Sequence, residues 1–326
     1  MRKSLTYLFV TTAFAGVSMA ANAEKWDMPL AYPANNFHSE NAAEFAACVK
    51  DKTDGKLEIV THPNGSLFAG NDIKRAVQTG QANIGERVTS AHENENAIYG
   101  VEAIPFLATS FEASDRLWKT ALPQMKQVLD SQNLVYVYSV PWPPSGFYTK
   151  KEINKVEDLE GIKFRAYNAA TARIAELAGM VPMQIEAAEL SQALATGVVD
   201  SIMTSSTTGV DSKVWEQGIT HFYNVQAWLP RNTVFVNKRA WNGLDDDTRA
   251  AITECGDITY DKGLQKVMAL ADEYMQTLEE NGVTVSPPSP ELEAGLAKLG
   301  EVMTAEWLER AGDAGQEIID AFRAQQ

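Results

Sequence analysis

The sequence predicts an α/β protein of two lobes, and three observations support this prediction. Candidate strands and helices alternate in the order β-α-β-α-β from residue 24 onward, an order typical of an α/β lobe. The alternation restarts near Pro143, which indicates a second lobe of the same class. A helical tract over residues 245–282 follows, and at about 1.5 Å per residue it is long enough to straddle both lobes.

The first lobe begins with the strand KWDMPLAY, residues 25–32, and after a loop a helix is predicted over residues 40–53. Asp54-Gly55 ends that helix, and KLEIVTHP forms the next strand. A helix over residues 71–80 ends at a glycine and leads to a short strand over residues 81–88. This alternation predicts a largely parallel sheet.

The next elements complete the first lobe and build the second. A proline-containing helix over residues 114–132 precedes a strand over residues 134–142. The second lobe repeats the alternation, with strands predicted at 145–153, 162–167, 181–186 and 198–206 and helices at 168–179 and 187–197. In the strand over 162–167, apolar residues alternate with Lys163, Arg165 and Tyr167, which is the period of a half-buried strand.

The last third of the chain returns across both lobes. The segment WLPRNTVFVNKRAW, residues 228–241, is predicted to cross between them, and prolines 287, 288 and 290 mark a loop before the last amphipathic helices. We therefore expect a first lobe from residues 24–142 with about 230–265, and a second lobe from residues 143–229 with about 266–326.

Residues 1–23 are predicted to be a secretory signal that is removed. Arg2 and Lys3 precede an apolar run, and Ala21-Asn22-Ala23 forms a small-x-small cleavage site. The alternative is a membrane anchor, but an anchor needs about 20 strongly apolar residues, whereas this segment is short and rich in Thr and Ala. We expect cleavage after Ala23 and a mature protein in the periplasm.

The charge of the mature chain argues against two classes of partner. It carries 26 basic and 43 acidic side chains, a net charge of −17. Nucleic acid and anionic membrane surfaces are therefore not expected as partners. An anionic small ligand is compatible with this charge, because one local arginine can oppose the field of the whole protein.

No motif for catalysis or cofactor binding is found in the sequence. It contains no GxSxG elbow, HExxH, CxxC, Walker loop or GxGxxG. The four histidines are scattered, and none has a second histidine at metal-ligand spacing. We expect no enzyme activity, no metal and no cofactor.

Two cysteines, Cys48 and Cys255, lie on helical patterns in a chain predicted to be exported. An oxidising compartment favours a disulfide between them. The alternative is a pair of buried thiols, since free cysteine is often buried. A disulfide would close a loop of roughly 200 residues and make elements that are distant in the sequence neighbours in space.

Arg165 lies near the C-terminal end of its predicted strand, just before a helix. In α/β sheets, ligands bind at this end of the strands. A guanidinium group at this position would lie where a ligand could bind, in a protein that is otherwise acidic.

Residues 161–201, GIKFRAYNAATARIAELAGMVPMQIEAAELSQALATGVVDS, resemble the signature region of the solute-binding subunits of tripartite ATP-independent periplasmic (TRAP) transporters. The matching features are the G-x-K-x-R strand, the N-A-A-T helix start and the segment E-L-x-x-A-L-x-T-G-x-V-D. The segments TDGKLEIVTHPNGSLFAG, AVQTGQANIG and FVNKRAWNGLDDDTRAAI are also similar to family segments. The resemblance spans essentially the whole mature chain.

The resemblance implies a fold and a function. The fold would be periplasmic-binding-protein-like, with two α/β lobes joined by crossing strands and a long helix, and a ligand cleft between the lobes. The protein would bind a solute and present it to the TRAP membrane permease subunits, which use an ion gradient. The family's arginine in G-x-K-x-R forms a two-point salt bridge with the ligand's carboxylate, and Arg165 takes that position. The alternative is that Arg165 pairs with a structural Asp or Glu between the lobes.

The chain departs from the family pattern near the expected site. Many members carry G-x-x-N after the V-D pair, and the asparagine contacts the ligand. Here Val199-Asp200 is followed by Ser201-Ile202-Met203-Thr204, so Thr204 and Ser205 would offer hydroxyl groups instead of an amide. Where some members place another basic or polar residue, this chain has Ser145-Gly146-Phe147. We expect a site less basic than that of a sialic-acid binder.

Further ligand contacts are predicted among aromatic and polar residues near the cleft. Aromatic rings suit sugar faces or aromatic acids, although packing in the core or hinge is the alternative for each ring. Glu86 would suit ligand hydroxyls, and Arg87 would be a second carboxylate anchor. The other candidates are Tyr32, Phe37, Trp142, Phe147, Trp215, Trp228 and Asn232.

The expected ligand is a small monocarboxylate: a sugar acid, a hydroxy acid or an aromatic carboxylate. Two alternative functions remain at this point. In the first, the protein senses a ligand for a sensor kinase. In the second, it is a secreted hydrolase or lyase, which needs an acid–base pair that the sequence does not display. We expect a monomer, because amphipathic C-terminal helices usually face their own core.

Overall fold

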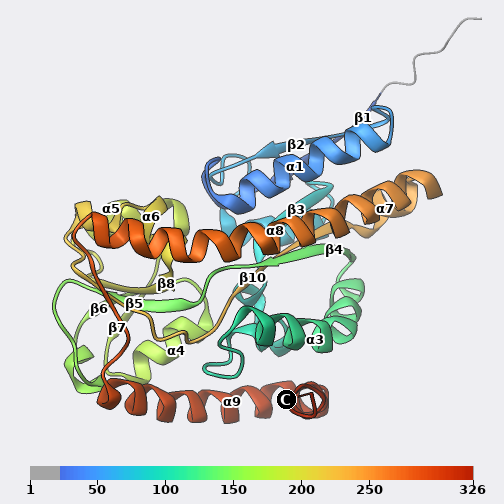
Figure 1. Cartoon of the computed structure of the whole chain (residues 1–326). Coiled ribbons are helices and arrows are strands. Elements are labelled where there is room, and N and C mark those ends of the chain that lie inside the picture. Colours follow the sequence, from blue (N-terminus) through green and yellow to red (C-terminus); the bar gives the residue numbers. More distant parts are fainter. Residues whose placement is uncertain (1–22, 326) are drawn as a thin grey trace, which may run out of the picture.

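The computed structural model describes residues 23–325, and in this part of the chain three β-sheets are covered by helices (Figure 1). The predicted signal, residues 1–23, lies outside the described residues except for Ala23. Two sheets and their helices form the first lobe, and one six-stranded sheet forms the second. The two-lobe α/β class predicted from the sequence is confirmed.

The first lobe contains a parallel pair and an antiparallel three-stranded sheet. Strands β1 (Glu24–Pro29) and β2 (Leu57–His62) are parallel. In the other sheet, β10 (Arg231–Asn237) lies between β3 (Ile84–Val88) and β4 (Leu134–Pro141) and runs antiparallel to both. The prediction of a largely parallel sheet is therefore wrong for this part, because a strand from late in the chain is inserted in the reverse direction.

Helices α1 (Phe37–Lys52), α2 (Ile73–Gln78) and α3 (Phe111–Ser131) cover these strands. Helix α1 begins three residues before the predicted start, because the side chain of Asn36 accepts a hydrogen bond from the backbone of His38 and caps the helix. The remaining short elements are α7 (Lys238–Gly243) and three 3₁₀ turns at Gly70–Asp72, Thr89–His92 and Ala97–Ala103.

The second lobe is built on a six-stranded sheet with the order β11-β9-β5-β8-β6-β7. Strand β6 is parallel to β7 and β8, and β5 is antiparallel to β8 and β9. The strands are β5 (Ser145–Thr149), β6 (Lys163–Ala166), β7 (Val181–Gln184), β8 (Ser201–Ser205), β9 (His221–Tyr223) and β11 (Thr284–Ser286).

Helices on both faces of this sheet enclose two hydrophobic clusters. The clusters contain Phe164 on one side and Tyr148 on the other, both fully buried. The short elements of this lobe are α4 (Ala169–Leu177), α5 (Leu190–Ala195), α6 (Ser206–Asp211) and 3₁₀ turns at Val156–Leu159, Ala187–Glu189 and Val214–Gln217.

The long helix α8 (Asp246–Glu280) crosses both lobes, as the sequence predicts (Figure 1). It packs on α1 and β4 of the first lobe and on α6 and β11 of the second. Gly263 allows α8 to lie close to β4, since a Cβ atom at this position would lie 2.8 Å from the side chain of Val140. Cys48 of α1 and Cys255 of α8 form a disulfide, with 5.8 Å between their Cα atoms.

The last helix, α9 (Pro290–Arg323), returns from the second lobe to the first, with a bend at Gly312. Its first turns bury Leu292 and Leu296 in a second-lobe cluster, and its last turns bury Ile318 and Phe322 in the first-lobe core. This differs from the expectation that residues about 266–326 belong to the second lobe, because the apolar face of α9 continues across both.

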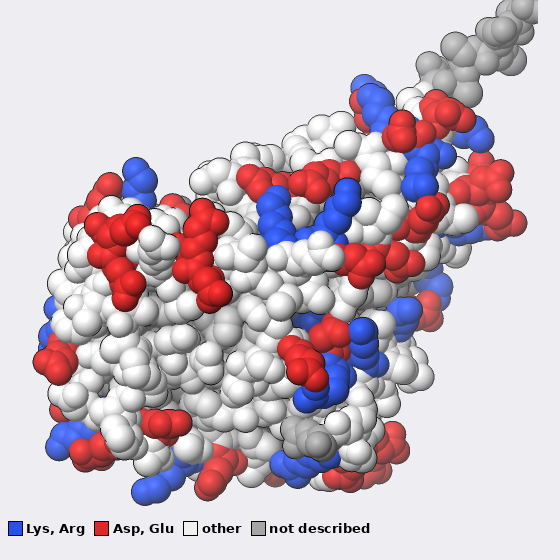
Figure 2. Space-filling model, viewed as in Figure 1, with Lys and Arg blue, Asp and Glu red and all other residues white. Residues whose placement is uncertain are grey.

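On the face drawn in Figure 2, acidic side chains gather over both ends of α8 and a broad area below it carries little charge. Across the described residues, the helices are all too short or too polar to span a membrane. The same residues hold no cluster of three or more His, Cys, Asp or Glu side chains that could bind a metal ion.

Candidate ligand-binding site

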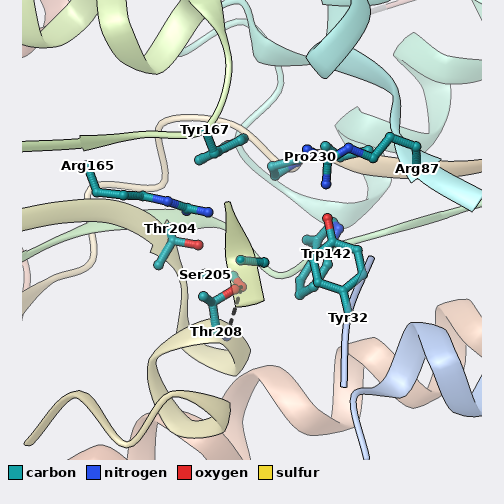
Figure 3. A pocket seen from close by; sticks show the side chains of 11 residues that line it. Tyr32, Arg87, Trp142, Arg165, Tyr167, Thr204, Ser205, Thr208 and Pro230 are labelled. Carbon is teal, nitrogen blue, oxygen red and sulfur yellow. Dashed lines mark hydrogen bonds between the residues drawn. The ribbon is translucent and has the colours of Figure 1, made fainter. Parts of the chain in front are cut away.

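A partly open cavity of about 40 Å³ lies between the two lobes, near the ends of strands β3, β6 and β8 (Figure 3). Arg165 on β6 and Thr204 on β8 reach it from the second lobe, and Arg87 on β3 reaches it from the first. Trp142 follows β4 and completes the wall. The full lining is Tyr32, Arg87, Val88, Trp142, Arg165, Tyr167, Ala187, Thr204, Ser205, Thr208 and Pro230.

Arg165 extends into this cavity with the end of its guanidinium group free (Figure 3). Its Nε donates a hydrogen bond to the backbone oxygen of Ile185 at 2.9 Å, and the two terminal nitrogens have no hydrogen bond or ion pair with any described residue. Burial lowers the pKa of Arg165 to about 10, so the group remains charged at neutral pH. The alternative in which Arg165 pairs with a structural carboxylate is therefore wrong within the described chain.

Hydroxyl groups lie next to this guanidinium group. Thr204 is the penultimate residue of β8 and lines the cavity, and Figure 3 shows its hydroxyl near the end of Arg165. Ser205 caps α6, and its Oγ lies 2.7 Å from the Oγ1 of Thr207. The cavity therefore offers a charged donor beside neutral groups that can donate or accept.

An aromatic wall faces these polar groups. The rings of Tyr32 and Trp142 meet edge to face, with centroids 4.8 Å apart. Phe37 packs behind Trp142, with ring centroids 5.2 Å apart, and does not line the cavity. Tyr167 lines it but was missed as a candidate, although its position two residues after Arg165 puts it on the same face of the strand. No feature of the sequence indicated that Pro230 and Ala187 line the cavity.

Three predicted aromatic contacts lie away from the cavity. Phe147 is fully buried in the core of the second lobe, with its ring 6.1 Å from that of Phe164. Trp215 packs against the other cluster of that lobe. Trp228 is also buried, and its Nε1 donates to the hydroxyl of Tyr167 at 3.1 Å, so it supports a lining residue from behind. Core packing is the correct interpretation for these rings.

Glu86 and Asn232 lie behind Trp142 rather than in the lining. The Nε1 of Trp142 donates to the Oδ1 of Asn232 at 2.8 Å, and the Nδ2 of Asn232 donates to Glu86 Oε1 at 2.7 Å. Burial raises the pKa of Glu86 to about 8, against the opposing effect of the hydrogen bond from Asn232. These hydrogen bonds fix the plane of the Trp142 ring.

Arg87 lines the cavity but already has a carboxylate partner. Its Nη2 donates to Asn71 Oδ1 at 2.7 Å and to Glu186 Oε2 at 3.1 Å. Glu186 follows β7 and belongs to the other lobe. Arg87 therefore differs from the prediction of a free second anchor, because its charge is largely offset by the protein.

Two further hydrogen bonds join the lobes near the cavity. The Nδ2 of Asn168 donates to Ser90 Oγ at 2.9 Å, and the Nδ2 of Asn36 donates to Asp211 Oδ2 at 2.7 Å. Together with the Arg87–Glu186 pair, they hold the lobes closed over the cavity. Burial raises the pKa of Asp211 to about 6.

Comparison with known proteins identifies the family. The family described as bacterial extracellular solute-binding protein, family 7, matches residues 30–310. The chain belongs to this family. It is a solute-binding protein of the TRAP type and not an enzyme, which removes the hydrolase or lyase alternative.

Solved structures of TRAP solute-binding proteins share the whole fold. One is a marine metagenome protein from an unidentified microbe, described as specific for pyroglutamate and bound to co-purified pyroglutamate. It has 51% identity and a TM-score of 0.91, covering 93% of this chain and 99% of that one. DctP6 of Bordetella pertussis, an extracytoplasmic solute receptor binding pyroglutamic acid, has 43% identity and a TM-score of 0.91, covering 92% and 100%.

Curated relatives are more distant. The uncharacterized protein YiiZ of Salmonella typhimurium is 30% identical over 178 residues, which is 52% of this chain. This match spans about half of the relative, 54% of its length. The family and the solved structures make this TRAP protein an extracytoplasmic receptor, in agreement with the periplasmic location expected from the sequence.

Proposed function

We propose that this TRAP solute-binding protein is a receptor for pyroglutamate or a closely similar small cyclic monocarboxylate. The observation that carries the proposal is Arg165, which lines the cavity between the lobes and whose two terminal nitrogens have no hydrogen-bond partner among the described residues. The ligand named for the two solved structures above, pyroglutamate, carries one carboxylate. It is a cyclic amide, and so lies outside the sugar acids, hydroxy acids and aromatic carboxylates expected from the sequence.

The chemistry of pyroglutamate suits the lining. Its carboxylate would accept two parallel hydrogen bonds from Arg165, a planar fork on a planar acceptor. Its flat ring would pack on the wall made by Tyr32, Trp142 and Tyr167. The amide N–H and C=O of the ring need an acceptor and a donor, and the hydroxyls of Thr204 and Ser205 can supply both roles.

The partner we propose is a TRAP membrane permease that takes the ligand from the closed receptor and uses an ion gradient. The family assignment supports this partner over a sensor kinase. Uptake of labelled pyroglutamate into vesicles that contain the permease subunits, dependent on added receptor and on an ion gradient, tests this part. Uptake that proceeds equally without the receptor would contradict it.

The ligand assignment is tested by thermal unfolding of the mature protein after bound ligand has been removed by unfolding and refolding. The panel contains pyroglutamate, proline, uronates, hydroxybenzoates and succinate. A ligand at 100 times its Kd adds about 2.7 kcal/mol to the free energy of unfolding. We expect this shift for pyroglutamate alone. Proline controls for the ring amide, because it keeps the five-membered ring and the carboxylate but has a protonated amine and no ring C=O in place of the amide.

Replacement of the anchor should abolish that shift. Arg165→Ala removes the charge that faces the carboxylate, and loss of one partner of such a desolvated pair costs about 2–5 kcal/mol of binding free energy. Arg173→Ala is the matched control, because Arg173 is an exposed arginine that pairs with Glu306 on the outer surface. An unchanged shift in the Arg165 variant would show that the ligand is anchored elsewhere.

A further inference from the structure

The two arginines of the cavity differ in what they can offer a ligand. Arg165 is held through Nε by a neutral backbone oxygen, that of Ile185, and its terminal nitrogens are free of described partners. Arg87 instead donates from Nη2 to Asn71 and to the carboxylate of Glu186, the latter at 3.1 Å. One positive charge is open to a ligand, and the other is already matched by the protein.

Adjacent residues after β7 create this difference. Residue 185 supplies a carbonyl oxygen, which orients Arg165 and leaves its charge intact. Residue 186 supplies a carboxylate, which offsets the charge of Arg87. Burial lowers the pKa of Arg165, and of its charged neighbours Arg87 lowers it further whereas Glu186 raises it, so both groups act on Arg165. Together they contribute a net charge of one positive unit.

The Arg87–Glu186 pair is closely packed by the residues around it. The side chain of Arg87 is 3% exposed and that of Glu186 is 22% exposed. Gly70 packs directly against the pair, because a Cβ atom there would lie 2.8 Å from Glu186 Oε2 and 3.0 Å from Arg87 Nη1. Gly70 does not have a positive φ angle, so the glycine serves to leave space for these side chains.

The pair also connects the lobes. Arg87 belongs to β3 in the three-stranded sheet, and Glu186 follows β7 in the six-stranded sheet. A ligand with two carboxylates could bridge the lobes by binding Arg165 with one and Arg87 with the other. Glu186 already accepts a hydrogen bond from Nη2 of Arg87, so a second carboxylate would have to compete with Glu186 or lie beside its negative charge.

We propose that Glu186 is a specificity-determining residue that restricts this site to ligands with one carboxylate. It excludes linear dicarboxylates by offsetting the charge of Arg87 and by repelling a second carboxylate that approaches Arg87. The inference rests on the proposed function, since it presumes a carboxylate bound to Arg165. It predicts that the receptor closes around a monocarboxylate without needing a second charge on the ligand.

The test is isothermal titration calorimetry of the stripped mature protein with pyroglutamate, glutarate and succinate. We expect the wild type to bind pyroglutamate and neither dicarboxylate. Glu186→Gln keeps the size of the side chain and removes its charge, which leaves Arg87 able to bind a carboxylate. We expect this variant to bind at least one dicarboxylate. Its affinity should be at least about tenfold higher than any residual affinity of the wild type, which is the size of a charge-assisted contact.

Two further variants make the result specific. Glu189→Gln removes one negative charge from the same turn, but Glu189 is exposed and has no arginine partner among the described residues, so no dicarboxylate binding should appear. The double variant Arg87→Gln/Glu186→Gln should lose the dicarboxylate binding gained by Glu186→Gln. Circular dichroism checks that each variant folds, and Glu186→Ala carries the same prediction if Glu186→Gln does not fold.

The outcomes separate this inference from the proposed ligand. Dicarboxylate binding by the wild type, no gain in either Glu186 variant, or a gain that persists without Arg87 would each overturn the role of Glu186. If the wild type does not bind pyroglutamate but Glu186→Gln binds a dicarboxylate, the ligand named under Proposed function is wrong. That result would still support Glu186 as the residue that sets the number of carboxylates.

Discussion

At the scale of single residues, the behaviour of Glu86 follows from its burial. Only 2% of its surface is exposed, it accepts a hydrogen bond from Asn232, and its Oε2 has no partner among the described residues. A pKa of about 8 means that the folded protein retains a proton on Glu86 at neutral pH. A neutral acid costs far less to bury than a carboxylate, which explains how this group is tolerated beneath the cavity.

This protonation predicts how stability depends on pH. Between about pH 4.5, where the unfolded carboxyl titrates, and about pH 8, the folded state holds a proton that the unfolded state has lost. The free energy of unfolding should therefore decrease as pH rises through this window, by at most about 1.4 kcal/mol per pH unit for this proton. Chemical denaturation of the wild type and Glu86→Gln at several pH values measures the difference. Parallel pH profiles would mean that Glu86 does not titrate in this range.

At the scale of elements, the disulfide between α1 and α8 joins helices that also share surface ion pairs. Cys48 and Cys255 are 207 residues apart in sequence, so the bond restricts a very long loop in the unfolded chain. We expect the double variant Cys48→Ala/Cys255→Ala to lose about 2–5 kcal/mol in the free energy of unfolding. Urea denaturation measures this loss.

The exposed ion pair between the same helices serves as the control for that variant. Lys52 Nζ lies 2.8 Å from Glu254 Oε1, and solvent reaches both side chains. Lys52→Ala should cost no more than about 1 kcal/mol, because exposed pairs are screened and poorly ordered. Equal losses in the two variants would contradict a dominant effect of the disulfide.

The helices and strands differ in how well the sequence could predict them. The periodic elements were predictable, and the long helix α8 lies close to its predicted bounds because caps and turn residues mark its ends. Strands β9 and β11 were missed because three residues are too few to show an alternating pattern. The reversed position of β10 also could not be predicted, since strand direction depends on contacts between distant segments.

The site was partly predictable for the same physical reason. The strand end indicated Arg165, the comparison with the family pattern indicated Thr204, and the aromatic residues of the first loop indicated Tyr32, and all three line the cavity. The sequence could not show that Arg87 is paired, because its partner Glu186 lies on the other lobe, 99 residues away. Side-chain pairing across a cleft is a property of the tertiary structure.

At the scale of the whole molecule, closure of the lobes should take up a proton. Asp211 accepts a hydrogen bond from Asn36 across the cleft, and its other charged or titratable neighbours are Glu40 on α1 and Tyr274 on α8. Burial raises the pKa of Asp211 in the closed form to about 6, above the ordinary value of 3.8. An open cleft would expose Asp211 to water and return its pKa toward that value.

Ligand affinity should therefore increase as pH falls from about 6 toward 4, and be independent of Asp211 above about pH 7. Calorimetry with pyroglutamate in buffers of different ionisation enthalpy measures the proton taken up on binding, which we expect at pH 5 but not at pH 7.5. Asp211→Asn preserves an oxygen that can accept from Asn36 and removes the titration, so proton uptake should disappear while binding remains. Uptake at pH 5 that persists in this variant would assign the proton to another group, and the closing of the cleft would then be independent of the ionisation of Asp211.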